Sequence, residues 1–176
     1  MDAIRETEAA PMKNRTTVER TSERELVVTR TVNGPARLVF EAWTKPELFK
    51  RWWVPKSSGM TMLSCEMDIR TGGTYRLVFS HPSFEKPMAF FGRYIEVLPG
   101  SRIVWTNDEG GEDGGAVTTV TFEDKGGATL VVLRELYPSK AALDEAIASG
   151  STSGFGEQFE QLDELLVTLG ANLGGS

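Results

Sequence analysis

A series of short strand patterns between Met60 and Leu136 is the sequence feature that most limits the fold of this chain. Apolar and polar residues alternate along these patterns, and turn residues such as Gly72-Gly73 and Pro99-Gly100 separate them. Strands at such short, even intervals are typical of antiparallel hairpins, because parallel neighbours need long crossover connections. The stretch therefore predicts one continuous antiparallel sheet.

Helical patterns lie on both sides of these strands. Before them, a strand pattern over Arg24–Val32 leads into two short helices, Ala36–Thr44 and Pro46–Trp52. Proline suits the first turn of a helix, and Pro55 stops the second one. After the strands, Ser139–Ala148 has the pattern of a short helix, with its serine as the N-cap.

The C-terminal pattern predicts one long amphipathic helix over Phe155–Leu169, which Gly170 is expected to end. A sheet with one apolar face must be covered, and this helix is the only predicted element long enough to do so. We therefore predict an α+β helix-grip fold with about seven strands, curved round the C-terminal helix. Two short helices follow the first strand, and such an arrangement tends to leave a cavity.

The predicted strands and helices form a single domain over residues 24–170. Residues 1–23 are polar and show no apolar period, so we expect a flexible tail there, and residues 171–176 are expected to be a second tail. Either Met1 or Met12 could be the start of translation, and the sequence leaves this open.

The composition excludes several classes of function. The net charge of −6 and the isoelectric point near 5.0 argue against a nucleic-acid or anionic-membrane surface. With Cys65 as the only cysteine and His81 as the only histidine, we expect no disulfide, no metal site and no cofactor. The sequence contains neither a spanning apolar run nor an apolar signal segment, so we expect a cytoplasmic protein.

Five colinear motifs carry a resemblance to a known family. They are NGPARLVFEAWTKPEL over 33–48, RWWVPK over 51–56, DIRTGGTY over 68–75, GRYIEV over 92–97 and FEQLDELLVTL over 159–169. Together they resemble the SRPBCC (START-like) superfamily, and within it the branch named for the activator of the heat shock protein 90 ATPase. Val54 stands where that branch usually has glycine. The resemblance spans about residues 24–169 and implies the helix-grip fold.

The resemblance implies several functions. Most members of the superfamily bind apolar small molecules between sheet and helix, some are cyclases or hydrolases, and the namesakes bind a chaperone. We expect this chain to bind an apolar or aromatic small molecule in that cavity. The alternatives are a cyclase- or hydrolase-type enzyme that uses the same cavity, and a protein-interaction module that is either a homodimer or, by family analogy, a chaperone partner.

The candidate ligand-binding residues share the inward parity of the strands or the apolar faces of the helices. They are Trp43, Trp52, Met62, Tyr75, Leu77, Phe79, Phe91, Trp105, Phe122, Phe159 and Leu162. Tryptophans can form the stacking wall of a pocket, but they can equally hold the two short helices against the sheet. Which of them face a cavity is left open.

The weak catalytic candidates are Asp68, His81 and Glu135. Each could act as an acid or base at a cavity, but each also has a structural explanation. Asp68 could pair with Arg70 in a turn, His81 could be a solvated strand end, and Glu135 could face solvent. The sequence contains no phosphate loop, nucleophile elbow or metal-ligand spacing, so an enzymatic role has no signature of its own.

Overall fold

The computed structural model describes residues 16–108, 115–148 and 154–174, with only the backbone for 170–174. An antiparallel sheet of eight strands runs through it in the spatial order β1-β2-β8-β7-β6-β5-β4-β3. The strands are β1 (Thr17–Arg20), β2 (Glu25–Val32), β3 (Thr61–Met67), β4 (Thr74–Ser80), β5 (Met88–Leu98), β6 (Arg102–Thr106), β7 (Val117–Asp124) and β8 (Thr129–Leu136).

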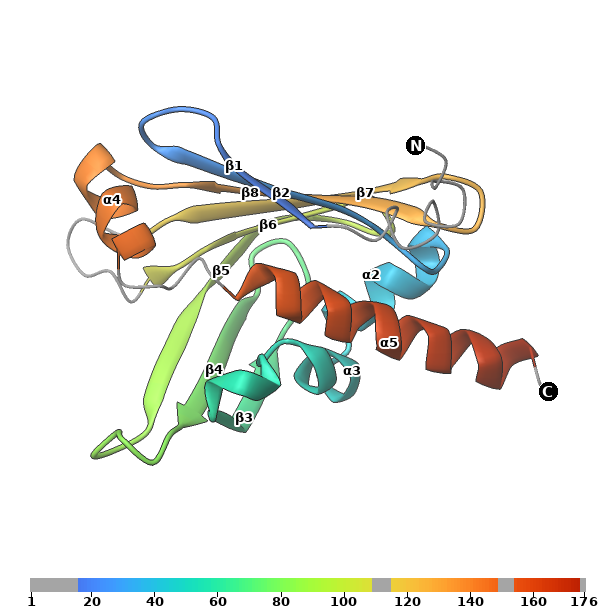
Figure 1. The fold of residues 1–176 in the computed structure, drawn as a ribbon, viewed down its shortest axis with the longest axis horizontal. Coiled ribbons are helices and arrows are strands. Elements are labelled where there is room, and N and C mark those ends of the chain that lie inside the picture. The colour runs from blue at the N-terminus through green and yellow to red at the C-terminus, as the bar shows by residue number, and fades with distance from the viewer. Residues whose placement is uncertain (1–15, 109–114, 149–153, 175–176) are drawn as a thin grey trace, which may run out of the picture.

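The helices in the described residues are α2 (Ala36–Thr44), α3 (Pro46–Trp52), α4 (Lys140–Ala148) and α5 (Phe155–Gly174), with the 3-10 turn η1 (Lys56–Ser58). Helix α5 crosses the inner side of the curved sheet, and α2 and α3 lie beside it (Figure 1). Its buried residues recur at three- and four-residue intervals and end at Leu166. The predicted helix-grip fold is therefore confirmed.

Two element boundaries differ from the sequence prediction. Strand β1 lies within the region predicted as a tail, and it pairs with β2 along its whole length. All four of its side chains are exposed, so it shows no alternation of burial that a sequence pattern could reveal. Helix α5 continues through Gly170, because glycine inside a helix costs about 1 kcal/mol but does not stop it. Residues 1–15, 175 and 176 of the predicted tails lie outside the described residues.

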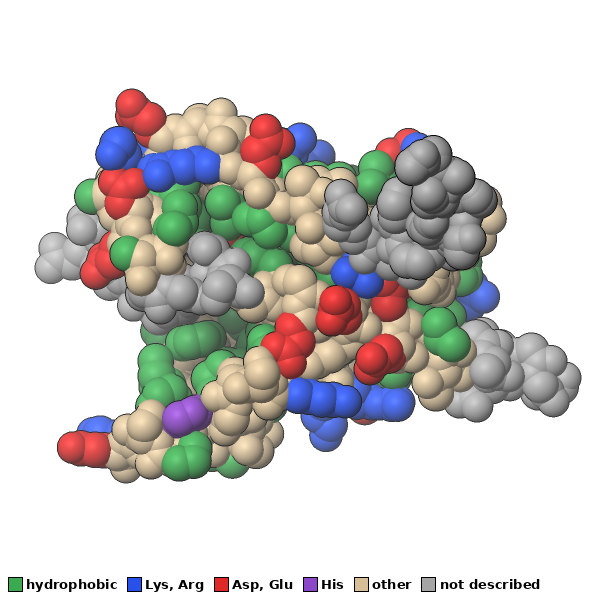
Figure 2. All heavy atoms as spheres, viewed as in Figure 1, with side chains coloured by type: hydrophobic (Ala, Val, Ile, Leu, Met, Phe, Trp, Pro, Cys, Tyr) green, Lys and Arg blue, Asp and Glu red, His purple; other side chains and the backbone are tan. Residues whose placement is uncertain are grey.

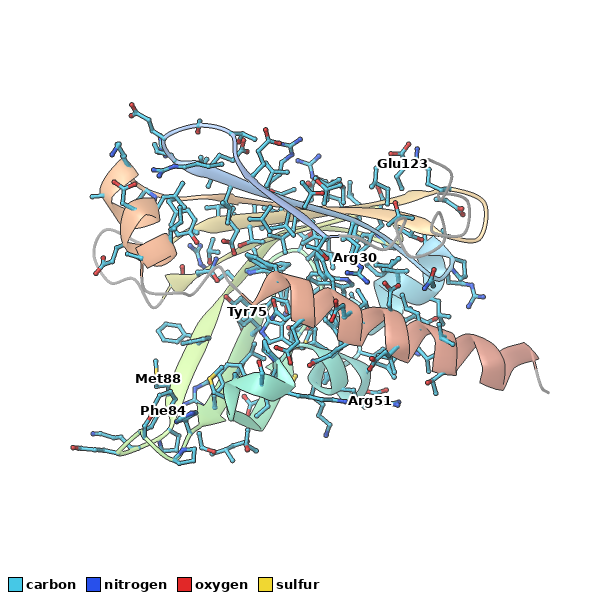
Figure 3. The ribbon with its side chains drawn as sticks, in the orientation of Figure 1. Arg30, Arg51, Tyr75, Phe84, Met88 and Glu123 are labelled. Atoms are coloured by element: carbon cyan, nitrogen blue, oxygen red, sulfur yellow. The ribbon has the colours of Figure 1, made fainter. Side chains whose placement is uncertain are left out.

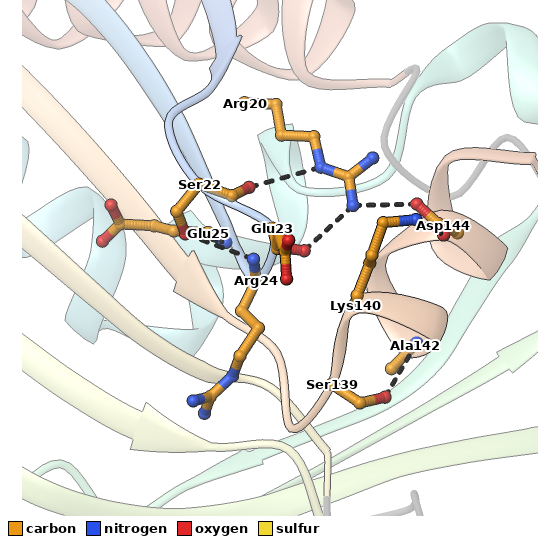
Figure 4. A network of polar contacts seen from close by, with 9 residues as sticks. All are labelled: Arg20, Ser22, Glu23, Arg24, Glu25, Ser139, Lys140, Ala142 and Asp144. Carbon is orange, nitrogen blue, oxygen red and sulfur yellow. Dashed lines mark hydrogen bonds and ion pairs between the residues drawn. The ribbon is translucent and has the colours of Figure 1, made fainter.

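Helix α4 is connected to the turn between β1 and β2 (Figure 4). The Arg20 guanidinium contacts Asp144 of α4 at 2.8 Å and donates to the carbonyls of Ser22 and Glu23. The hydroxyl of Ser139 accepts a hydrogen bond from the Ala142 N–H at 3.1 Å, which confirms the predicted N-cap. These exposed polar contacts attach the first strand to the chain that precedes α5.

Strand β5 bends the sheet, since its first half pairs with β4 and its second half with β6. Gly92 lies at the bend, where an added Cβ would come within 1.9 Å of the Thr106 carbonyl oxygen. The register of the β5–β6 pair also shifts between Tyr94 and Glu96. Glycine is thus required for a close backbone approach, which turns the β3–β4 side of the sheet toward the helices.

A buried ion pair joins β2 to α5. The Arg30 guanidinium donates to the Asp163 carboxylate at 2.9 and 2.6 Å, and the same carboxylate accepts from the Asn33 N–H at 2.7 Å. The two side chains are 6% and 9% exposed, so solvent screens the pair only weakly. Arg30 lies between the sheet and α5 in Figure 3. This contact therefore defines the position of the helix on the sheet.

We expect Asp163→Asn to lower the free energy of unfolding by about 3 kcal/mol, because it leaves the buried Arg30 charge without its counterion. Urea denaturation of wild type and variant measures the difference. Asp144→Asn is the matched control, since the same chemical change breaks an exposed ion pair and should alter stability little. Equal effects of the two substitutions would contradict the role given to the buried pair.

Candidate functional site

A cavity lies between the inner face of the sheet and helices α2 and α3. Its volume is about 60 Å³, and the hollow spans about 500 Å³ when the open space at its mouth is counted. The residues that line it are Trp43, Phe49, Trp53, Met67, Tyr75, Leu77, Phe90, Tyr94, Ile103, Trp105 and Asn107. Hydrophobic side chains also gather in the recess beside the β4–β5 hairpin (Figure 2). The site is thus an apolar cavity with a few polar atoms.

Trp43 is the centre of the aromatic packing around this cavity. The rings in contact with its indole, at centroid distances of 4.7 to 6.4 Å, belong to Phe49, Trp52, Trp53, Trp105, Phe122 and Phe159. Most of these pairs are edge-to-face or tilted, which is the arrangement that aromatic quadrupoles favour. Trp43 is 2% exposed, yet its Nε1–H has no hydrogen-bond partner in the part of the chain that the structure describes.

Trp52 and Trp53 have different roles although they are neighbours. Trp52 is fully buried, and its Nε1–H donates to the Ala42 carbonyl oxygen at 2.9 Å, which ties α3 to α2. Trp53 is half-buried and lines the cavity, stacked on Phe49 with ring centroids 4.7 Å apart. Successive helical side chains point about 100° apart, so only one of the two can face the cavity. In the structure, Trp53 is the one that lines the cavity.

Two tyrosines place hydroxyl groups in the cavity region. The Tyr75 hydroxyl donates to the Thr106 carbonyl oxygen at 2.8 Å and also contacts Asn107 Oδ1 at 3.3 Å. No hydrogen bond of the Tyr94 hydroxyl occurs within the described residues. Burial raises the pKa of Tyr94, and the nearby Cys65 and Asp68 add to the rise. Tyr94 therefore presents a neutral hydroxyl, able to donate or accept.

The structure separates the predicted ligand-binding residues into three groups. Those that line the cavity are Trp43, Tyr75, Leu77 and Trp105. Those buried in the core outside the cavity lining are Trp52, Phe79, Phe122, Phe159 and Leu162, and Met62 is half-buried beside them. Phe91 is 42% exposed, and its predicted inward orientation is wrong. Its neighbour Phe90 points inward and lines the cavity instead, because residues 90, 92 and 94 of β5 share the inner face.

Several lining residues were missed by the sequence prediction: Phe49, Trp53, Met67, Phe90, Tyr94, Ile103 and Asn107. Met67 was hidden by a bulge between Met62 and Ser64, which puts Met67 opposite Tyr75 on the inner face. A bulge reverses the parity of a strand without leaving a signal in the sequence. Ile103, by contrast, shares its parity with Trp105 and could have been included on that ground.

Two of the predicted catalytic residues lie away from the cavity lining. The Arg70 guanidinium donates to both carboxylate oxygens of Asp68 at 3.0 and 3.1 Å, in an exposed turn before β4. His81 Nδ1 lies 3.0 Å from the Ser83 N–H and 2.7 Å from its hydroxyl, where β4 ends. Both arrangements match the structural explanations offered for these residues.

Glu135 is different, because it shares the inner face of β8 with Val131 and Leu133. Across the sheet it lies beside Thr118, which in turn lies beside the cavity residue Trp105. The Tyr137 hydroxyl donates to its carboxylate at 2.8 Å. Burial raises the pKa of Glu135, and the bond from Tyr137 offsets part of that rise. An inward carboxyl group thus stands near the cavity without lining it.

A polar cluster at this end of the sheet lies between the cavity and Glu135. The Asn107 amide donates to the Ala116 carbonyl oxygen at 2.7 Å and to the Thr118 hydroxyl at 3.2 Å. The Asn107 side chain is consequently held in place from both sides, with its carbonyl oxygen against Tyr75. The two polar residues Asn107 and Thr118 therefore separate the apolar cavity from the Glu135 carboxyl group.

Searches of the described residues for two other kinds of site give negative results. No group of three or more His, Cys, Asp or Glu side chains among them is placed to hold a metal ion. No helix within the same residues is long and apolar enough to cross a membrane.

The family of the "Activator of Hsp90 ATPase homolog 1-like protein" matches residues 33–167 of this sequence. The chain belongs to this family. The match contains the cavity residues that precede α5 and the buried face of α5 itself. A search of the curated proteins finds no match.

Solved structures share the fold of this family member. A protein from Rhodobacter sphaeroides is 22% identical with a TM-score of 0.78, and the alignment covers 87% of this chain and 99% of that one. A protein from Nitrosomonas europaea is 25% identical with a TM-score of 0.76, covering 86% and 99%. An AHSA1-like protein from Aeromonas hydrophila is 15% identical with a TM-score of 0.60, covering 79% and 94%. These likenesses show the fold alone.

The inward carboxyl group should make stability depend on pH. As pH rises above the ordinary glutamate pKa near 4.5, the unfolded chain loses this proton before the folded protein does. Glu135 therefore contributes less stability as pH rises from that value through its raised pKa. In urea titrations, we expect Glu135→Gln to gain stability relative to wild type as the pH rises above the ordinary glutamate pKa and through the raised pKa of Glu135.

Tyr137→Phe serves as the companion variant, because it removes the hydroxyl group that stabilises the Glu135 carboxylate. The decline of stability with pH should be steeper in this variant than in wild type. A free-energy difference between Glu135→Gln and wild type that stays constant with pH would show that the carboxyl group titrates as it does in the unfolded chain.

Proposed function

We propose that this protein binds a small apolar or aromatic molecule in the cavity between the sheet and helices α2 and α3. The observation that supports the proposal is the lining itself, in which aromatic and aliphatic side chains come from two helices and four strands. Small-molecule sites are concave and mostly apolar, with a few polar groups that orient the ligand. Membership of a START-like family supports a ligand-binding role in general.

The dimensions of the cavity limit the size of the ligand. A cavity of about 150 Å³ holds benzene in a protein core. The volume of about 60 Å³ found here is smaller, and only the hollow with its mouth, at about 500 Å³, exceeds that size. A ligand with a single ring, placed partly in the mouth, fits this shape better than a long lipid does. Trp53, which follows α3, is a half-buried part of this lining.

The alternatives receive less support from the described residues. Enzymatic acid–base chemistry would depend on Glu135, whose carboxyl group is held by Tyr137 and separated from the cavity by Thr118. A protein-interaction role, as a homodimer or a chaperone partner, remains a hypothesis from the family analogy. Light scattering tests whether the protein is a homodimer. The ATPase rate of the chaperone, measured with and without this protein, tests whether it is a chaperone partner.

Two neighbouring phenylalanines offer a matched test of the proposal. Phe90→Trp enlarges a side chain that lines the cavity, whereas Phe91→Trp enlarges one exposed on the opposite face of β5. We expect α-methylstyrene to bind wild type and Phe91→Trp saturably in an NMR titration. Phe90→Trp should bind it at least about tenfold more weakly, because the added ring atoms occupy the space of the ligand.

Equal affinity of the two variants would place the bound hydrocarbon outside this cavity. If wild type shows no saturable binding of α-methylstyrene or of other single-ring compounds, the proposed function is wrong. Circular dichroism of both variants checks that the sheet and helices are retained.

A further inference from the structure

We propose that the ligand carries an uncharged hydrogen-bond acceptor, such as a ketone or aldehyde oxygen, that accepts from the Trp43 Nε1–H. This inference rests on the proposed function and specifies the chemical class of the ligand. It depends on three observations on the described residues: a buried donor without a partner among them, a lining with several donors, and the absence of Lys, Arg, His, Asp and Glu from that lining.

The buried donor is the strongest observation. Buried polar groups in folded proteins nearly always have a hydrogen-bond partner, and an unpaired one costs about 1–3 kcal/mol. Trp43 is 2% exposed and its Nε1–H is unpaired within the described residues, whereas the equally buried Trp52 donates to Ala42. The described residues thus satisfy the Trp52 indole of this cluster and not the Trp43 indole.

The surroundings of Trp43 explain why the protein supplies no acceptor. Its indole is enclosed by aromatic rings from α3, β6, β7 and α5, and these side chains carry no strong acceptor. Trp43 is also one of the residues that line the cavity. A molecule bound there, beside the indole, can supply the acceptor that the described residues do not.

The other polar groups of the lining favour the same ligand chemistry. Indole N–H groups and tyrosine hydroxyls are donors, and the carbonyl oxygen of Asn107 is already in contact with Tyr75. The Tyr94 hydroxyl, which makes no hydrogen bond within the described residues, offers a further donor. A ligand with an acceptor would therefore meet donors at Trp43 and Tyr94, two of the residues that line the cavity.

Charge further restricts the class of ligand. Among the described residues, no Lys, Arg, His, Asp or Glu lines the cavity, so an ionised ligand would lose its hydration without gaining a counterion from them. Aryl ketones, aldehydes and esters satisfy both conditions, since they are uncharged and offer a carbonyl oxygen. Aryl carboxylates and ammonium compounds are excluded by the same argument.

Indole NMR of the full chain labelled with ¹⁵N-tryptophan tests the proposal. Acetophenone and α-methylstyrene are nearly isosteric probes, one with a carbonyl oxygen and the other with a methylene group in its place. We expect acetophenone to shift the Trp43 indole N–H resonance downfield, because hydrogen bonding has this effect. α-Methylstyrene should not cause this downfield shift. The Trp52 indole proton is the internal control, because its bond to Ala42 should persist with either probe.

A second measurement follows the affinity itself. Replacing the Trp43 indole by benzothiophene keeps the two rings and substitutes sulfur for the N–H. We expect the affinity for acetophenone relative to α-methylstyrene to fall about tenfold in this variant, the effect of one lost hydrogen bond. The ratio of affinities corrects for any loss of packing, because both probes occupy the same altered site.

The outcomes separate the two proposals. In one outcome, both probes bind while the Trp43 indole resonance responds to neither; in another, the benzothiophene variant keeps the wild-type affinity ratio. Either result overturns the proposed hydrogen-bond acceptor and leaves the small-molecule function standing. Saturable binding of benzoate at the same site overturns the requirement for an uncharged ligand. Failure of every probe to bind wild type overturns both proposals together.

Discussion

The apolar inner face of the sheet is the constraint on which the rest of the structure depends. Strands β2, β6, β7 and β8 each direct buried side chains toward the same side, and water must be excluded from that surface. Helix α5 covers it with residues such as Phe159, Leu162 and Leu166. Apolar contact alone does not determine where a helix lies, and the Arg30–Asp163 pair supplies this directional information.

Covering the sheet with one helix leaves a space that α2 and α3 fill incompletely. Trp52 joins these two helices through the Ala42 carbonyl oxygen, and Trp43 joins them to the sheet through ring contacts. The cavity lies where β5 bends the sheet and turns its β3–β4 side toward these helices, beside the close approach of Gly92 to Thr106. Its walls are thus formed by helices and strands, with Trp53 where α3 ends.

Trp43 shows how packing and binding can make opposite demands on one residue. A tryptophan at the centre of so many ring contacts stabilises the core by burying a large apolar area. The same burial leaves its N–H without a partner among the described residues, a local cost that folded proteins rarely carry. Trp43 is therefore both the centre of the aromatic packing and the lining residue whose buried N–H is unpaired within the described residues.

The sequence by itself determined the fold of this protein. Strand alternation, proline and glycine positions and the amphipathic face of α5 are local patterns, and the family motifs agree with them. It also identified part of the cavity lining, namely Trp43, Tyr75, Leu77 and Trp105, because their parity follows from regular strands and helices. Only the tertiary structure decided the remainder, because a bulge in β3, the bend of β5 and the partner of each indole N–H arise from contacts between residues far apart in the chain.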